Sequence, residues 1–116
     1  MSTPSKPTPK QHLPHSTALE EGFDRGYLSN VLVELGPDLL YPVFFTTVSR
    51  LVGELSTMRA YGEPYIVETG MIVVHEITRE NLDAAVTAMV AEGWFDYQVP
   101  LTRARVDAAT PFEWPP

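Results

Sequence analysis

Residues 71–90 read MIVVHEITRENLDAAVTAMV, and this junction of an apolar run with a periodic polar segment decides the fold class. Residues 71–74 are apolar on both faces, as a central strand requires. Thr78 is a good helix N-cap, and Ile77 and Leu82 stand in the two positions of a hydrophobic staple. A strand that leads into a helix is therefore expected. The predicted buried stripe of that helix is Leu82, Ala85, Val86, Met89 and Val90, followed by a stop at Gly93 and Trp94.

Upstream, residues 27–45 have the pattern of a β-hairpin. Val31, Val33 and Leu35 alternate with Asn30, Leu32 and Glu34, a spacing of two that is typical of a strand. The triplet at residues 36–38, Gly-Pro-Asp, predicts a turn, and residues 39–45 form the second strand. Pro42 has no N–H for a ladder hydrogen bond, so this strand should lie at a sheet edge or carry a bulge.

A second helix is expected between the hairpin and residue 62. Thr46 or Thr47 can cap it, and Gly62 is a natural stop. Gly53 is interpreted as a sign of a tight helix–sheet crossing, because glycine otherwise weakens a helix. Its apolar positions keep the rhythm of one buried stripe: Val48, Leu51, Val52, Leu55 and Met58.

These elements predict an α+β two-layer sandwich in the order β-β-α-β-β-α-β. The mostly antiparallel sheet has four to five strands, with residues 65–69 and 95–101 supplying extended segments, and both amphipathic helices lie on one face. Residues 1–17, rich in proline, are expected to form a disordered arm in which His12 and His15 are solvated. Residues 18–102 form the single domain, and residues 103–116 form a C-terminal tail.

The composition excludes several classes of function. The chain has 116 residues, no cysteine and a formal net charge of -7. From residue 11 onward, six arginines face fifteen carboxylates, which leaves a net charge of -9. Such a surface repels nucleic acid and anionic membranes and favours a basic partner. Disulfides and thiolate metal sites are excluded. Because neither a membrane span nor a signal peptide is recognisable, a soluble, cytoplasmic protein is expected.

The pair His75-Glu76 is the first candidate for chemistry. A zincin motif is absent, since position 79 is arginine and no histidine follows His75. Neighbouring residues of a strand point to opposite faces, so the two side chains do not form one site. His75 could still act as a general base if Glu34, Glu68 or Asp96 lies beside it. The alternative is a histidine that is only hydrogen-bonded or solvated at a strand end.

Motifs for other activities are missing. The sequence contains no P-loop, no Gly-x-Ser-x-Gly elbow and no EF-hand loop, and we expect no cofactor and no metal site. An enzyme is therefore less expected than a binding protein. Aromatic residues near strand ends and in the C-terminal third are typical of interface anchors, although a two-layer core also needs them. The candidate partner-binding residues are Glu34, Glu68, Glu76, Asp96, Tyr97, Phe112 and Trp114.

Three segments together resemble small acidic bacterial immunity proteins of toxin–immunity pairs. They are YPVFF at residues 41–45, RLVGEL at residues 50–55 and GMIVVHEITRENLDAAVTAMVAEGWF at residues 70–95. The resemblance covers residues 27–95 and implies an α+β protein that binds and blocks a cognate toxin, with no catalytic residues to carry over.

The leading hypothesis is thus a non-catalytic acidic module that neutralises a basic protein partner, without nucleic acid or membrane, and with a homodimer through an edge strand as a further possibility. Two alternatives stay open. One is a small-molecule-binding or catalytic α+β domain that uses His75. The other is a structural or assembly subunit tethered by its tails.

Overall fold

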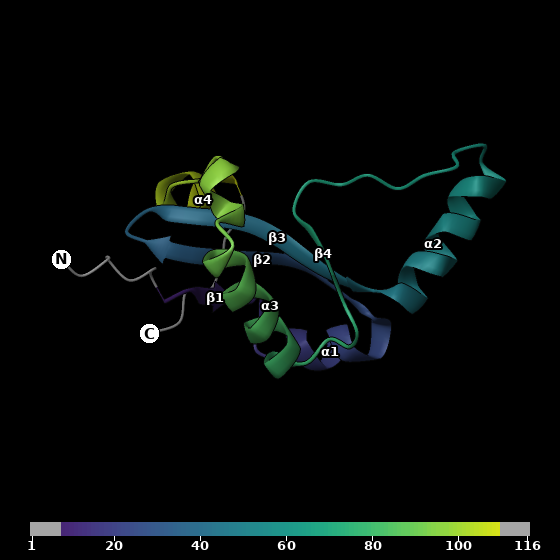
Figure 1. Cartoon of the computed structure of the whole chain (residues 1–116), viewed down its shortest axis with the longest axis horizontal. Coiled ribbons are helices and arrows are strands. Elements are labelled where there is room, and N and C mark those ends of the chain that lie inside the picture. Colours follow the sequence, from purple (N-terminus) through teal and green to yellow (C-terminus); the bar gives the residue numbers. More distant parts are fainter. Residues whose placement is uncertain (1–7, 110–116) are drawn as a thin grey trace.

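The computed structural model describes residues 8–109, and their side chains as far as Val106. The fold is α+β, as predicted, but the order of its elements differs from the expected one (Figure 1). The elements are β1 (Lys10–His12), α1 (Ala18–Arg25), β2 (Tyr27–Gly36), β3 (Leu39–Thr47), α2 (Val48–Ala60), β4 (Met71–Val74), α3 (Arg79–Ala91), the 3-10 helix η1 (Trp94–Tyr97) and α4 (Arg103–Ala109).

The four strands form one mixed sheet in the order β1-β2-β3-β4. The β1–β2 and β2–β3 pairs are antiparallel, and β3 and β4 are parallel. The predicted hairpin is confirmed: Asp38, in its turn, has a positive φ of 57°, and Glu34 on β2 pairs with Leu40 on β3. β4 was expected in the centre of the sheet and lies instead at its edge. One edge of β4 therefore has no neighbouring strand among the described residues.

The strand that contains Pro42, β3, lies between β2 and β4, so the expected position at a sheet edge is wrong. The N–H of Phe44 donates to the Gly70 carbonyl, and the N–H of Leu40 donates to the Leu101 carbonyl. Pro42 has the same strand parity as both, so its missing N–H falls between those two hydrogen bonds, before β4 begins pairing at Phe44. The absent donor consequently breaks no ladder bond.

α3 forms as predicted and supplies one layer of the core. The hydroxyl of Thr78 accepts a hydrogen bond from the Asn81 N–H at 3.2 Å, which caps the helix. Ile77 and Leu82 are both almost fully buried, in agreement with a hydrophobic staple. Val86 and Val90 are buried behind them. Local sequence signals were sufficient here because cap, staple and stripe all lie within one segment.

α1 was not expected, and it covers the same face of the sheet as α3. Gly22 on α1 allows a close approach, since a Cβ at this position would lie 2.9 Å from Ile77 Cγ2. The helix ends at Gly26, which has a positive φ of 67°. The main core joins α1, α3 and the sheet through these buried residues: Ala18, Leu28, Val31, Val33, Val43, Phe45, Ile72, Val74, Ile77, Leu82, Val86, Val90 and Phe95.

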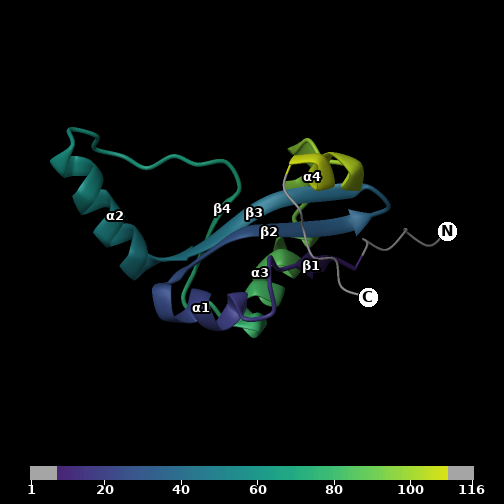
Figure 2. The same ribbon diagram turned by 180° about the vertical axis from the view of Figure 1, so that it is seen from behind.

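The opposite face of the sheet carries α4 (Figure 2). Val106 packs with Leu32 and Leu40 in a small second cluster, and Leu101 forms an isolated bridge with Leu40. Residues 103–109 were assigned to a tail, and the helices were expected on one face only. Both expectations differ from the structure, because the apolar contact of Val106 with the sheet gives this short helix something to bury.

In three further segments, the structure differs from what the sequence predicted. Lys10–His12 is a strand rather than part of a disordered arm, because β1 adds to the edge of β2 through its backbone and needs no apolar pattern. Residues 65–69 form no strand. Within 95–101, the expected strand is replaced by η1, in which Phe95 is buried and packs edge-on against Trp94 at 4.9 Å.

Candidate protein-binding surface

α2 and its return segment project away from the rest of the molecule (Figures 1 and 2). The predicted helix is present, but no residue of α2 is buried, so the expectation of a buried stripe is wrong. Val48 and Val52 are 61% and 60% exposed. A Cβ at Gly53 would have no neighbour within 4 Å, so no tight crossing occurs there. We call α2 with residues 61–70 the arm.

The root of the arm is fixed by Gly26 and Thr47. The Thr47 N–H donates to the Gly26 carbonyl at 3.0 Å, and the Thr47 hydroxyl donates to the same oxygen at 3.4 Å. That hydroxyl also accepts from the Arg50 N–H and so caps α2. A Cβ on Gly26 would lie 2.6 Å from Thr47 Oγ1, so glycine is required where α1 ends and α2 begins.

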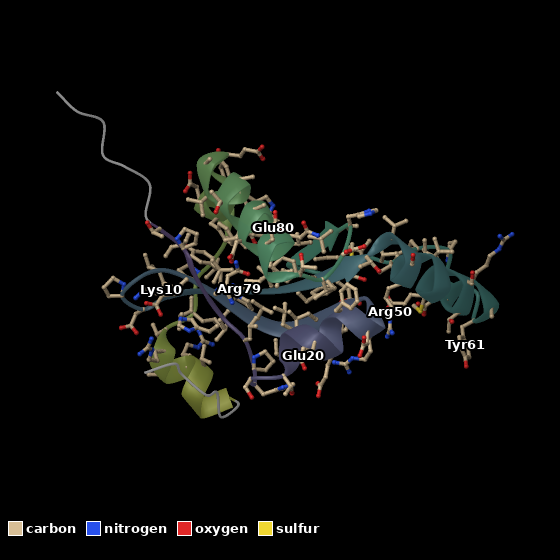
Figure 3. All side chains as sticks on the ribbon, turned by 90° about the horizontal axis from the view of Figure 1, so that it is seen from below. Lys10, Glu20, Arg50, Tyr61, Arg79 and Glu80 are labelled. Atoms are coloured by element: carbon tan, nitrogen blue, oxygen red, sulfur yellow. The ribbon has the colours of Figure 1, made fainter. Side chains whose placement is uncertain are left out.

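A second set of contacts holds the first turns of α2 against β2. The Arg50 guanidinium lies 5.4 Å from the centre of the Tyr27 ring, within the range of a cation–π contact. Arg50 Nε also donates to Glu54 Oε1 at 2.9 Å. Figure 3 shows Arg50 at the end of α2 nearest α1 and Tyr61 at the far end, pointing outward. The direction in which the arm leaves the sheet is therefore set by its own residues.

A groove of about 730 Å³ runs between α2 and the return segment. We call it the arm groove. Its lining residues are Tyr27, Ser49, Arg50, Gly53, Glu54, Thr57, Met58, Glu63, Tyr65, Ile66, Val67 and Glu68. The lining contains the carboxylates of Glu54, Glu63 and Glu68 and one guanidinium, that of Arg50. Arg50 already forms an ion pair with Glu54. The lining thus combines negative charge with apolar and aromatic surface.

The charged residues that line the groove affect the pKa of Tyr27. Partial burial raises the pKa of its phenol above the ordinary value, and the negative charges of Glu68 and Glu54 raise it further, while Arg50 acts in the opposite direction. Glu68 belongs to the return segment and Glu54 to α2. Charges from both walls of the groove therefore act on the same side chain.

His75 and Glu76 lie in the connection between β4 and α3, and both are exposed. They line a shallow depression with Phe23 and Asp24 of α1. Among the side chains that the structure describes, none forms a hydrogen bond or ion pair with His75, and Glu34, Glu68 and Asp96 belong to other regions. The structure does not bring together the His–carboxylate couple considered for acid–base chemistry.

Glu34 has a structural role instead. Its Oε1 accepts from His12 Nε2 at 2.9 Å and from Arg103 Nη2 at 3.0 Å. His12 is only 5% exposed, so the expectation that it is solvated is wrong. His15 is exposed, and its Nε2 atom lies 3.4 Å from Glu21 Oε2. A carboxylate held by two donors is a weak candidate for capturing a partner.

The other predicted partner-binding residues within residues 8–109 do not form one surface. Glu68 lines the arm groove, and Glu76 lies beside His75. Asp96 and Tyr97 are exposed on η1, where Tyr97 is 90% exposed. Phe112 and Trp114 lie outside the described residues. Of the five candidates that lie among the described residues, only Glu68 lines the groove.

Sequence reasoning missed most of the groove, including Glu54, Glu63 and Tyr65. The signal that could have found them is the length of residues 61–70: a crossover helix packed on its sheet rarely needs so long a return. The apolar rhythm of α2 concealed this, since periodicity shows that a helix has an apolar face but not what covers it.

Comparisons with protein-family models, with curated proteins and with solved structures found no match to this chain. In the part of the chain that the structure describes, no cluster of three or more carboxylate or imidazole side chains is arranged to hold a metal ion. None of the helices within residues 8–109 has the length and apolar content needed to cross a membrane.

Proposed function

We propose that this protein is a non-catalytic, acidic protein-binding module that neutralises a basic protein partner, in the manner of immunity or inhibitor proteins. The observation that carries the proposal is the arm groove, in which Glu54, Glu63 and Glu68 surround apolar and aromatic surface on a projecting part of the molecule. Such a groove accepts a lysine or arginine side chain together with the apolar residues beside it.

The position of the groove supports this function. The arm leaves the sheet through a root fixed by Thr47 and Gly26, so the α2 wall of the groove is oriented before a partner arrives. Tyr65 is 61% exposed and Val67 is 80% exposed, and both line the groove, so apolar surface is gathered there within reach of a partner. Aromatic residues in such positions are typical anchors of protein interfaces. The net charge of -7 steers a basic partner toward the molecule.

The proposal is tested by covalent capture in the cells that produce the protein. A photo-reactive phenylalanine analogue replaces Tyr65, and the same analogue replaces Val99 as the control. Val99 is 86% exposed but lies outside the arm. We expect one predominant basic protein to be captured at position 65 and not at position 99. Equal capture at both positions, or capture of an acidic protein, would contradict the proposal.

The electrostatic part is tested with the captured protein after purification. The triple variant Glu54→Gln, Glu63→Gln, Glu68→Gln should weaken binding by about tenfold to a hundredfold, since exposed ion pairs each contribute up to about 1 kcal/mol. Its matched control is Glu20→Gln, Glu80→Gln, Glu92→Gln, which changes three exposed carboxylates elsewhere and has the same net charge. Equal weakening by both variants would show that overall charge matters and the groove does not.

A further inference from the structure

β4 lies at one edge of the sheet, with β3 on its inner side (Figure 1). The Phe44 N–H donates to the Gly70 carbonyl, so the backbone groups of Ile72, two residues further, also point toward β3. The N–H and C=O groups of Met71 and Val73 therefore point away from the sheet. Within residues 8–109, no hydrogen bond involves these four groups. They form a short row of donors and acceptors to which a further strand can be added.

The two edges of the sheet differ in how they are protected. Natural edge strands carry charged side chains, proline or bulges that discourage pairing with another chain. β1, at one edge, begins with Lys10 and reads Lys-Gln-His. β4 reads Met-Ile-Val-Val, with neither a charge nor a proline, and Val73 is 46% exposed. β4 is therefore the edge that accepts a further strand more readily.

Both ends of β4 are fixed by contacts within the chain. At the start, a Cβ on Gly70 would lie 2.7 Å from the Pro42 carbonyl oxygen, and the φ of 79° at Gly70 also requires glycine. At the end, the Glu76 carbonyl accepts from the Thr78 N–H at 3.1 Å and from Asn81 Nδ2 at 3.0 Å. The strand is thus extended before a partner arrives, which lowers the entropic cost of pairing.

The chain on either side of β4 is acidic. Residues 63–78 contain neither lysine nor arginine, and their carboxylates are Glu63, Glu68 and Glu76. Glu68 and Glu76 are exposed, and neither forms an ion pair with a described side chain. A strand laid along β4 meets one of these carboxylates where it runs past Met71 and the other where it runs past Val74. This arrangement favours a segment with lysine or arginine at both ends.

The same charges disfavour a second copy of this chain as the added strand. Two β4 strands paired antiparallel about a two-fold axis would bring Glu68 of one copy toward Glu76 of the other at both ends of the pair. Arg25 and Arg50 share a depression with Glu76, but each already forms an ion pair with a glutamate of its own helix. The occupant that fits the edge is therefore a basic segment of another protein.

We propose that β4 binds an extended segment of the basic partner as an additional strand of the sheet. The segment pairs its backbone with Met71 and Val73, places an apolar side chain beside Val73, and carries lysine or arginine beyond each end of the pair. The inference rests on the proposed function for the basic character of the partner. It adds that the partner is recognised through its main chain as well as through its charge.

A synthetic peptide with two lysines at each end, and alternating valine and threonine between them, serves as the probe for the full chain. The same peptide with glutamates in place of the lysines is its control. At about 1 mM, the lysine peptide should slow hydrogen exchange of the Met71 and Val73 amides about threefold or more in NMR spectra, and the glutamate peptide should not. No slowing by the lysine peptide would overturn the proposal. Slowing that rises with protein concentration alone would also overturn it, because a second copy would then occupy the edge.

N-methylation of the peptide separates main-chain pairing from other contacts without changing the protein. One peptide is methylated at its valine amides and another at its threonine amides. Because only alternate residues of an added strand turn their N–H groups toward β4, the affinities of the two peptides should differ by at least about tenfold. Equal affinities would overturn the proposal.

A substitution in β4 tests the edge itself. Val73→Lys introduces a charge of the kind that protects natural edge strands and should weaken binding of the lysine peptide by at least about tenfold. Val99→Lys adds the same charge at a residue that is 86% exposed and lies outside the sheet, so it should leave binding nearly unchanged. Circular dichroism verifies that both variants are folded. Equal effects of the two variants would overturn the proposal. Capture at position 65 without protection of β4 would overturn this inference alone, whereas loss of that capture would overturn the proposed function.

Discussion

The Nε2 atom of His12 lies 2.9 Å from Oε1 of Glu34, and the Nη2 atom of Arg103 lies 3.0 Å from the same oxygen. Three elements distant in sequence, β1, β2 and α4, therefore meet at one carboxylate. The hydrogen bond with His12 holds the pKa of Glu34 below its ordinary value, and the positive charges of His12 and Arg103 act in the same direction against partial burial. The ionised carboxylate is the form that the fold favours.

The first prediction follows from the sign of that shift. A carboxyl group with a lowered folded-state pKa stabilises the fold above its unfolded pKa, and this stabilisation disappears as the pH falls through the lowered value. Glu34→Gln should therefore lower the melting temperature near neutral pH, and the difference from the natural chain should shrink from about pH 4.5 downward. Thermal unfolding of both proteins from about pH 7 to about pH 3 checks this. A constant difference would contradict it.

The root of the arm gives a matched pair of glycine substitutions. Gly26→Ala places a methyl group 2.6 Å from Thr47 Oγ1 at a φ of 67°, so we expect a loss of about 2 kcal/mol or more in the free energy of unfolding. A Cβ at Gly53 meets no atom within 4 Å apart from the helix's own backbone, so Gly53→Ala should stabilise α2 by about 1 kcal/mol. Urea unfolding measures the first effect, and slower hydrogen exchange in α2 measures the second.

The third prediction concerns Tyr27. Burial and the charges of Glu68 and Glu54 raise the pKa of its phenol, so the neutral form is favoured in the fold. The resulting stabilisation is present below the unfolded pKa and is lost as the pH rises through the raised value. An absorbance titration compared with that of Tyr27→Phe isolates this group. Glu68→Gln should move the titration of Tyr27 to lower pH. No movement would show that the return segment does not lie beside Tyr27 in solution.

The sequence was informative wherever the determining residues are neighbours in the chain. The cap at Thr78 and the staple of Ile77 and Leu82 predicted α3 correctly, because a helix start depends on a few adjacent residues. The turn before Leu39 likewise predicted the β2–β3 hairpin. Caps, staples and turns depend on neighbouring residues, so a single sequence is sufficient to predict them.

Long-range pairing accounts for most of what was missed. His12 and Glu34 are 22 residues apart, and nothing in the polar surroundings of His12 indicates that β1 pairs with β2. Arg103 and Glu34 are 69 residues apart. Phe95 was assigned to a short extended segment, but it lies in a 3-10 turn, where it is buried and packs against Trp94. Such choices depend on the tertiary environment.

The last prediction compares two leucines that periodicity treated alike. Leu82 on α3 is fully buried, whereas Leu55 on α2 is 41% exposed. Leu82→Ala should lower the free energy of unfolding by about 2 to 5 kcal/mol, since it leaves a cavity in the core. Leu55→Ala should change it by no more than about 0.5 kcal/mol. Urea unfolding measures both. Equal losses would mean that α2 packs onto the body in solution, and the arm would then not project.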